Sequence, residues 1–428
     1  MEVDILLPRP VHGILAALRQ QGHAAYAVGG CVRDSLLGRP PCDWDVCTSA
    51  RPGEIQAAFP GKCLSSPGVR HGTITVLLEH TPYEVTTFRT DGAYSDHRHP
   101  DGVRFVRSVS QDLSRRDFTV NAMAYSPAAG LVDPFDGARD LDAKRLRCVG
   151  DPARRFAEDA LRILRMMRFA ACLGFSIEPR TEAAALRQCG VLAQLSAERC
   201  RDEFCKMLAG RWAPRVLHGQ RALFVPLLPS AAQSSERAWE EAVCAIAAAP
   251  GELCVRLGIL CRVVSPAQLA PLCPDAKTAQ TAALLAEYAD APLHALPSTA
   301  RRWLHRLGAE TLQRLVCLQA AFAAARGDRA KQTELAEFAE HLRRAVEGSA
   351  CYTRAQLAVN GADALRAGIP EGAAVGEALE ALLERVIDGT LPNERGVLLE
   401  QLAAWRTDAA CEQCSFCAQL PDAQAPAL

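Results

Sequence analysis

The spacing of apolar residues changes along the chain near residue 140. Upstream of that point, short runs of alternating or β-branched residues are separated by turn residues, which is typical of strands in a sheet. Downstream, apolar residues recur at intervals of three and four, and prolines divide the sequence into many helices. The pattern predicts an α+β protein, in which a head with a small mixed sheet precedes an all-α region. The expected strands are residues 25–28, 45–47, 72–78, 83–88, 103–106 and 121–125.

The length of 428 residues is too great for one compact domain, and roughly two to four domains are expected. Apolar residues make up 49% of the chain, so each domain can bury a core of its own. We expect a head at residues 1–140, a helical neck at 141–212, a helical body at 213–350 and a helical tail at 351–428.

The charge of the chain is nearly balanced, with 48 Lys and Arg against 49 Asp and Glu. This balance argues against a protein that holds nucleic acid through bulk positive charge, and it leaves room for a local basic face. The first residues show no basic segment followed by an apolar run, and no stretch approaches the ~18–20 apolar residues of a membrane span. We therefore expect a cytoplasmic protein that does not engage a membrane.

The 18 cysteines are scattered through helical and strand-like segments, which favours reduced and mostly buried thiols over a disulfide framework. One cluster stands apart, namely Cys411, Cys414 and Cys417 near the C-terminus. A zinc site would need a fourth ligand that the neighbouring sequence does not supply, so a polar tail with incidental thiols is the favoured interpretation.

A glycine turn follows the first expected strand. Gly29 and Gly30 allow a turn in which side chains would block close approach, and residues 32–37 can form a short helix capped by Gly38. A glycine turn that opens a helix presents backbone N–H groups to a phosphate, and Arg33 adds a planar cation suited to phosphate oxygens. This turn is a candidate phosphate site.

Two carboxylates follow the turn, at Asp43 and Asp45. Residues two apart in a strand point to the same face, and two adjacent carboxylates repel each other unless a cation lies between them. Oxygen ligands together with phosphates are what Mg²⁺ prefers. The alternative is an exposed acidic turn, but the nearby phosphate-type turn favours a metal site at Asp43 and Asp45.

These residues resemble the signatures of a known enzyme family. One stretch is Gly29-Gly30-Cys31-Val32-Arg33-Asp34, followed by Asp43-Trp44-Asp45. It resembles the first signature of class II tRNA nucleotidyltransferases and bacterial poly(A) polymerases. These enzymes belong to the polymerase-β-like superfamily. Their second signature resembles Arg115-Arg116-Asp117-Phe118-Thr119-Val120-Asn121-Ala122. The similarity continues through residues 156–162 to Arg165 and Arg168, and it covers residues 25–174.

The resemblance implies a polymerase-β-like head and transfer of nucleotides to an RNA 3′ end by two-metal catalysis. Asp43 and Asp45 are then expected to hold Mg²⁺. Glu84 occupies the place of a third carboxylate in related polymerases, with a solvent-facing strand residue as the alternative. The other expected nucleotide-binding residues are Gly30, Arg33 and Arg116 at the triphosphate, and Asp117 at the ribose or as an anchor of its own loop.

The resemblance further implies that Asp159 and Arg162 select the incoming base in place of a nucleic-acid template. We expect both residues on one face of one helix, because they lie three apart. A carboxylate accepts and a guanidinium donates, which suits the amino group and ring nitrogen of C and A and rejects U and G. Arg165 and Arg168 would continue toward the triphosphate and the RNA. The alternative is an ordinary amphipathic helix with a Glu158–Arg162 pair.

The segments between and after the signatures favour a CCA-adding enzyme that uses CTP and ATP on the tRNA acceptor end. Residues 68–76, the polar loop at 90–100 and, more loosely, residues 357–363 resemble the corresponding segments of such enzymes. An A-adding tRNA nucleotidyltransferase or poly(A) polymerase is the main alternative, and a non-catalytic RNA-binding module is the third. The sequence leaves open the number of subunits and the residues that contact the tRNA body.

Overall fold

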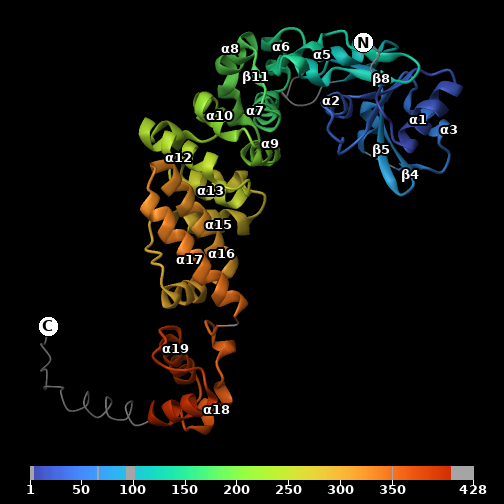
Figure 1. Cartoon of the computed structure of the whole chain (residues 1–428). Coiled ribbons are helices and arrows are strands. Elements are labelled where there is room, and N and C mark those ends of the chain that lie inside the picture. Colours follow the sequence, from blue (N-terminus) through green and yellow to red (C-terminus); the bar gives the residue numbers. More distant parts are fainter. Residues whose placement is uncertain (1–3, 65–66, 93–101, 349, 406–428) are drawn as a thin grey trace, which may run out of the picture. The chain divides into compact units, whose positions relative to one another are not determined.

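The computed structural model describes residues 4–64, 67–92, 102–348 and 350–405 (Figure 1). These residues pack as two compact units. The first unit comprises the chain up to Val243, with residues 251–253 and 260–280. The second comprises residues 244–250, 254–259 and the chain from Thr281 onward. The finer division into head, neck, body and tail stays a prediction.

The first unit is built on a seven-stranded sheet with the order β3-β4-β5-β2-β1-β8-β9. Strands β2 and β5 run parallel and the other neighbours run antiparallel, which confirms a mixed sheet. The strands of this sheet are β1 Ala25–Val28, β2 Asp45–Thr48, β3 Cys63–Leu64, β4 Thr73–Leu78, β5 Thr81–Thr87, β8 Ala124–Ser126 and β9 Gly130–Val132. Two smaller pairings join β6 Arg89–Asp91 to β7 Val103–Phe105, and β10 Arg145–Leu146 to β11 Ser176–Ile177.

Only the last expected strand differs clearly from the structure. Residues Thr119–Asn121 form a 3-10 turn, and β8 begins at Ala124. The Thr119 hydroxyl donates to Asp140 at 2.6 Å, and the Asn121 amide donates to Asp117 at 3.1 Å. These buried side-chain hydrogen bonds hold the segment in a turn, because polar side chains that bind nearby groups compete with a regular strand.

Two helices cover one face of the sheet, namely α1 Arg9–Gln20 and α3 Pro52–Ala58 (Figure 1). Their apolar side chains form one cluster with Val46 of β2 and Val85 of β5. Because successive residues of a strand point to opposite faces, Asp45 and Glu84 belong to the other face. The fold thus turns two of the candidate catalytic residues away from α1 and α3.

The chain is otherwise helical, as the spacing of its apolar residues predicts. The remaining helices are α2 Gly30–Leu36, α4 Val109–Ser114, α5 Gly137–Asp142, α6 Pro152–Glu158, α7 Leu161–Leu173, α8 Pro179–Gln188, α9 Ala197–Ala209, α10 Ala213–Gly219, α11 Arg221–Phe224, α12 Glu236–Ala248, α13 Leu253–Leu260, α14 Pro266–Leu269, α15 Ala276–Glu287, α16 Pro297–Arg326, α17 Arg329–Glu347, α18 Gly361–Arg366 and α19 Ala373–Ile387. Among the helices that the structure describes, none has the length and apolar character needed to cross a membrane.

The second unit contains an apolar cluster of its own. The side chains of α18, α19 and the residues that follow pack together, with Leu382, Leu398 and Leu402 buried. Helix α16 is interrupted at Gly308, whose φ of 73° and ψ of 166° are not helical, so two helical segments meet there at a kink. The cysteines in the described ranges are free thiols, and Cys411, Cys414 and Cys417 lie outside those ranges.

Candidate active site

The glycine turn brings the two family-like signatures into contact. Gly29 has a φ of 83°, in the left-handed region that glycine adopts without strain, and α2 begins at the next residue. A Cβ atom at Gly29 would lie 2.9 Å from Nη1 of Arg116, so a larger residue would have to displace this guanidinium. At the other end of α2, Gly38 has a φ of 67° and Arg39 N–H donates to the carbonyl of Asp34, which confirms the expected cap.

The candidate carboxylates lie beside this turn. Asp45 is the first residue of β2 and pairs with Val28, the last residue of β1. Asp43 precedes the strand, so the expectation that both project from one strand is wrong in detail. The strand begins later because the pairing with β1 ends where β1 gives way to the turn. Val46 of β2 pairs with Val85 of the parallel strand β5. Asp45 and Glu84 each precede one of these residues by one position, so they lie side by side.

The electrostatics of Asp45 fit a cation site. Burial by surrounding protein, then the charge of Asp43 and to a smaller degree that of Glu84, raise the pKa of Asp45 to about 6, and Arg116 acts in the opposite direction. The carboxylate still reaches the surface, so a ligand can meet it. Neighbouring carboxylates that repel one another are stabilised by a divalent cation, and the site therefore fits Mg²⁺ by its chemistry.

Protein carboxylates alone do not complete such a site. Within the described ranges, no group of three or more His, Cys, Asp or Glu side chains is arranged to hold a metal ion. Asp43 and Asp45 would therefore share the ion with phosphate oxygens, which is the usual mode for Mg²⁺ at phosphoryl-transfer sites. The metal-binding role of Glu84 stays a prediction.

The two triphosphate arginines lie in different environments. Arg33 is buried, donates through Nε and Nη2 to Asp34 at 2.9 Å each, and donates through Nη1 to Asn121 at 2.7 Å. Arg116 pairs with Asp112 at 3.5 Å, and its Nε is buried without a hydrogen-bond partner in the part of the chain that the structure describes. A buried donor that lacks a partner favours an acceptor supplied by a ligand, so Arg116 is the better placed of the two for phosphate.

Asp117 is held in a dense network. Its Oδ1 accepts from the Phe118 N–H at 2.8 Å and from Asn121 at 3.1 Å, and its Oδ2 accepts from Arg165 at 2.8 and 2.7 Å. Burial opposes ionisation, but the Arg165 charge and the hydrogen bonds prevail and lower the pKa of Asp117 to about 2. These contacts match the anchoring role, and the ribose contact stays a prediction.

The expectation that Asp159 and Arg162 share one helix is wrong. Helix α6 ends at Glu158, Asp159 is extended with a φ of −147°, and α7 begins at Leu161. The Asp159 carboxylate accepts from the Leu161 N–H at 3.0 Å and from Arg199 at 2.9 Å. A short polar side chain that binds the first amide of a helix favours a helix start, so these bonds stabilise a break between two helices.

Arg162 is fixed at the start of α7. Its Nη1 donates to Glu158 at 2.8 Å and to the Arg155 carbonyl at 3.1 Å, and its Nη2 donates to the Arg115 carbonyl at 3.1 Å. The Glu158–Arg162 pair of the alternative interpretation is therefore present, although it spans the helix break. These bonds use three of the five N–H donors of the guanidinium.

Helix α9 supplies two residues that the sequence pattern did not reveal. Arg199 holds Asp159, and Glu203 pairs with Arg168 at 3.0 Å and with Arg165 at 3.4 Å. Each partner lies some forty residues away in sequence, and no local motif links them. The spacing of Arg199 and Glu203 by four residues, which puts them on one helical face, is the only available signal.

An aromatic ring gathers three of the candidate arginines. The guanidinium groups of Arg33, Arg165 and Arg168 lie 5.1, 5.4 and 4.2 Å from the centre of the Phe169 ring. Cation–π contacts of this kind contribute about 0.5–2 kcal/mol each. Phe169 thereby joins the first signature to α7.

Comparison with known families agrees with this arrangement. The poly A polymerase head domain model matches residues 25–147, a model described as a probable RNA and SrmB-binding site of polymerase A matches 174–233, and a putative tRNA nucleotidyltransferase domain 2 model matches 287–402. The CCA-adding enzyme of Geobacillus stearothermophilus is 36% identical over 407 residues, covering 92% of this chain and 95% of that protein. The CCA-adding enzyme of Leuconostoc citreum is 50% identical over 205 residues, which are 48% of this chain and 50% of that protein.

Solved structures share the fold over nearly the whole chain. The CCA-adding enzyme of Bacillus stearothermophilus in complex with CTP aligns with a TM-score of 0.76 and 33% identity, covering 95% of this chain and all of that one. The Thermotoga maritima CCA-adding enzyme complexed with tRNA aligns with a TM-score of 0.65 and 21% identity over 94% of this chain and 97% of that one, which shows a common fold. This likeness, together with the site, shows that the chain belongs to the family of CCA-adding enzymes.

Proposed function

We propose that the protein adds C, C and then A to the 3′ end of tRNA from CTP and ATP, with release of pyrophosphate. The observation that carries the proposal is the position of Asp45 at the start of β2, beside the Gly29 turn. Asp43 lies close enough for its charge to raise the pKa of Asp45. A tRNA-maturing enzyme acts where tRNA is made, and we assign it to the cytoplasm.

We assign Asp43 and Asp45 to the binding of Mg²⁺, with Glu84 beside them. When bound, Mg²⁺ supplies Lewis-acid stabilisation of the attacking oxygen and of the leaving pyrophosphate. Arg116 meets the triphosphate with its Nε, which lacks a partner among the described residues, and the backbone at Gly30 approaches the phosphates. The protein thus holds the nucleotide and orients its α-phosphate for in-line attack.

Base selection is assigned to Asp159 and Arg162 despite the break between their helices. Both hydrogen bonds to the Asp159 carboxylate fall on Oδ1, so Oδ2 is the oxygen that we assign to the exocyclic amino group of C or A. Arg162 supplies a remaining N–H donor to the ring nitrogen. U and G present a carbonyl to the carboxylate and an N–H to the guanidinium, and both contacts are repulsive.

The test of this function is an incorporation assay with purified protein, Mg²⁺ and tRNA that ends before CCA. Each nucleoside triphosphate is supplied singly and in pairs, and product length is measured on a gel. The proposal expects two additions with CTP alone, three with CTP and ATP, and then a stop. Use of ATP without CTP would instead identify an A-adding enzyme or a poly(A) polymerase, and absence of any product would identify a non-catalytic module.

A further inference from the structure

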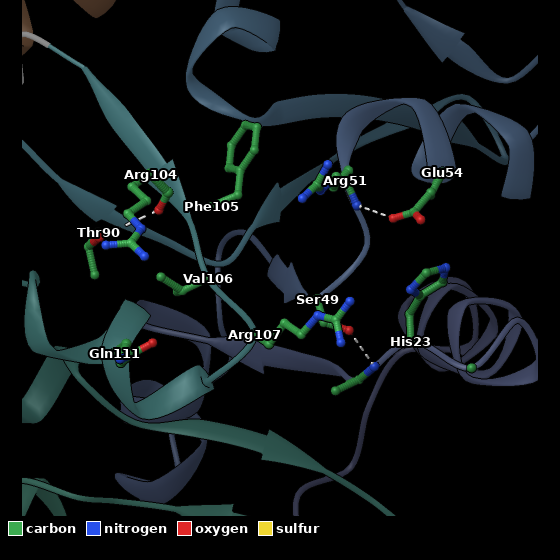
Figure 2. A pocket seen from close by; sticks show the side chains of 12 residues that line it. His23, Ser49, Arg51, Glu54, Thr90, Arg104, Phe105, Val106, Arg107 and Gln111 are labelled. Carbon is green, nitrogen blue, oxygen red and sulfur yellow. Dashed lines mark hydrogen bonds between the residues drawn. The ribbon is translucent and has the colours of Figure 1, made fainter.

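A cleft of about 1170 Å³ lies in the first unit, away from the carboxylates (Figure 2). It is lined by residues that precede β1, follow β2, begin α3, belong to the paired strands β6 and β7 or follow β7, and belong to α4. Asp45 begins β2 and Ser49 follows its end, so four extended residues, or about 13 Å, separate the catalytic carboxylates from the edge of the cleft. The cleft is therefore distinct from the proposed catalytic site.

The charge of this cleft is strongly positive for a chain whose net charge is −1. Arg51, Arg104 and Arg107 line it together with His23, and Glu54 is the one acidic residue among the described residues of the lining. The Glu54 carboxylate accepts the backbone N–H of Arg51 at 2.7 Å and is thereby committed to the start of α3. Three guanidinium groups thus face one carboxylate.

These three arginines differ from those at the proposed active site. All three are exposed, and none forms an ion pair with any residue in the described ranges. By contrast, the arginines of the two signatures are paired within the fold, as in Arg33–Asp34, Arg115–Asp112 and Arg116–Asp112. Like charges that surround one cleft repel each other, so an anionic ligand would relieve this repulsion.

The side chains that line the cleft favour contact with a charged backbone over recognition of a base. Figure 2 shows Arg107 extending toward Ser49, whose hydroxyl oxygen accepts the Ala24 N–H at 2.9 Å and can donate its own proton outward. Phe105, which also lines the cleft, packs against Gly72, where a Cβ atom would lie 2.7 Å from its ring. The ring is thus occupied within the protein, whereas Arg51, Arg104 and Arg107 are exposed.

We propose that this cleft binds the sugar–phosphate backbone of the tRNA substrate at a point away from its 3′ end. Guanidinium groups form strong paired hydrogen bonds with phosphate oxygens, and contacts of this kind position an RNA without reading its sequence. A few nucleotides span the distance between the catalytic carboxylates and the cleft. The proposal rests on the proposed function, since it takes tRNA as the ligand.

The test compares Arg51→Ala/Arg107→Ala with Arg9→Ala/Arg145→Ala, which removes two exposed arginines of the same unit outside the cleft. For each protein, CCA addition is measured as a function of tRNA, CTP and salt concentration. We expect the cleft variant to raise the KM for tRNA roughly tenfold and to lower the slope of log kcat/KM against log salt by about 2, one for each phosphate contact. Its KM for CTP should not change.

Control results decide between the possible readings. Arg51→Lys/Arg107→Lys, which keeps both charges, should retain most of the salt slope, and the control variant should behave as wild type. An unchanged KM for tRNA and an unchanged salt slope in the cleft variant would overturn the proposal. A rise confined to the KM for CTP would also overturn it, because the cleft would then serve the triphosphate. Failure of the proposed function shows separately, as absence of CCA addition by the wild-type protein.

Discussion

At the scale of single residues, charge decides which side chains serve the fold and which face a ligand. Asp117 and Asp45 are both carboxylates of the candidate site, yet their pKa values move in opposite directions, to about 2 and about 6. Asp117 has an arginine and two further N–H donors around it, whereas Asp45 has two other carboxylates nearby. The charge of Asp117 is therefore balanced by partners within the protein, whereas the charge of Asp45 is opposed by its neighbours.

Replacement of Asp45 by Asn should separate activity from stability. We expect incorporation to fall by at least roughly a thousandfold, because the metal loses a charged ligand. The raised pKa means that ionised Asp45 destabilises the folded state above pH 6, so the neutral side chain should leave the melting temperature unchanged or higher. Gel assays and thermal melting check the two effects. Residual activity close to wild type would place the metal site elsewhere.

Replacement of Asp117 by Asn should destabilise the protein in a pH-dependent way. The lowered pKa means that Asp117 stabilises the fold fully above its ordinary value of 3.8 and ceases to do so as the pH falls through about 2. This difference corresponds to about 2 kcal/mol at neutral pH.

Urea unfolding at pH 7 and pH 3 measures the effect of the Asp117 change. The difference in free energy of unfolding between wild type and the Asp117 variant should be smaller at pH 3 than at pH 7. The exposed control Asp142→Asn should show no such difference at either pH. Equal stability of the Asp117 variant and wild type at pH 7 would show that the network contributes nothing.

At the scale of elements, the break between α6 and α7 is a feature that the neighbouring sequence does not predict. The strands at 25–28 and 73–78 could be predicted because their own residues alternate or are β-branched. The break could not, because Asp159 is held by the Leu161 amide and by Arg199, forty residues downstream. In the same way, sequence identified Arg165 and Arg168 but not Glu203, the partner that orients them.

Replacement of Asp159 by Ala should act on the choice of base more than on tRNA binding. We expect incorporation of UTP and GTP to rise relative to CTP and ATP, because the acceptor that excludes a carbonyl is gone. Loss of the bond to the Leu161 amide should also lower stability by about 1 kcal/mol.

Arg199→Ala provides the matched control for Asp159, since it removes the ion pair and keeps the amide bond. Single-turnover incorporation of each triphosphate, with tRNA affinity measured in parallel, separates selection from binding. An unchanged preference among the four triphosphates in the Asp159 variant would remove this residue from base selection.

At the scale of the whole molecule, the chain is two packing units with separate apolar clusters. The candidate catalytic and base-selecting residues all fall in the first unit. Chains with more than one core often unfold in more than one step, and a ligand stabilises the part that binds it.

Calorimetry should therefore resolve two unfolding transitions. CTP with Mg²⁺ should raise the melting temperature of only one of them. At a CTP concentration one hundred times the Kd, the free energy of unfolding of the unit that binds CTP should increase by about 2.7 kcal/mol. The Asp45→Asn variant should lose this response while keeping both transitions. A single transition that shifts as a whole would show that the two units unfold together.

The positive φ of Gly29 restricts this position more than its contact with Arg116 does. A side chain at position 29 meets a strained backbone as well as the guanidinium, so shortening Arg116 relieves only one of the two obstacles. We therefore expect the change Gly29→Ala to destabilise the turn whether or not Arg116 is shortened as well, because the positive φ at position 29 remains.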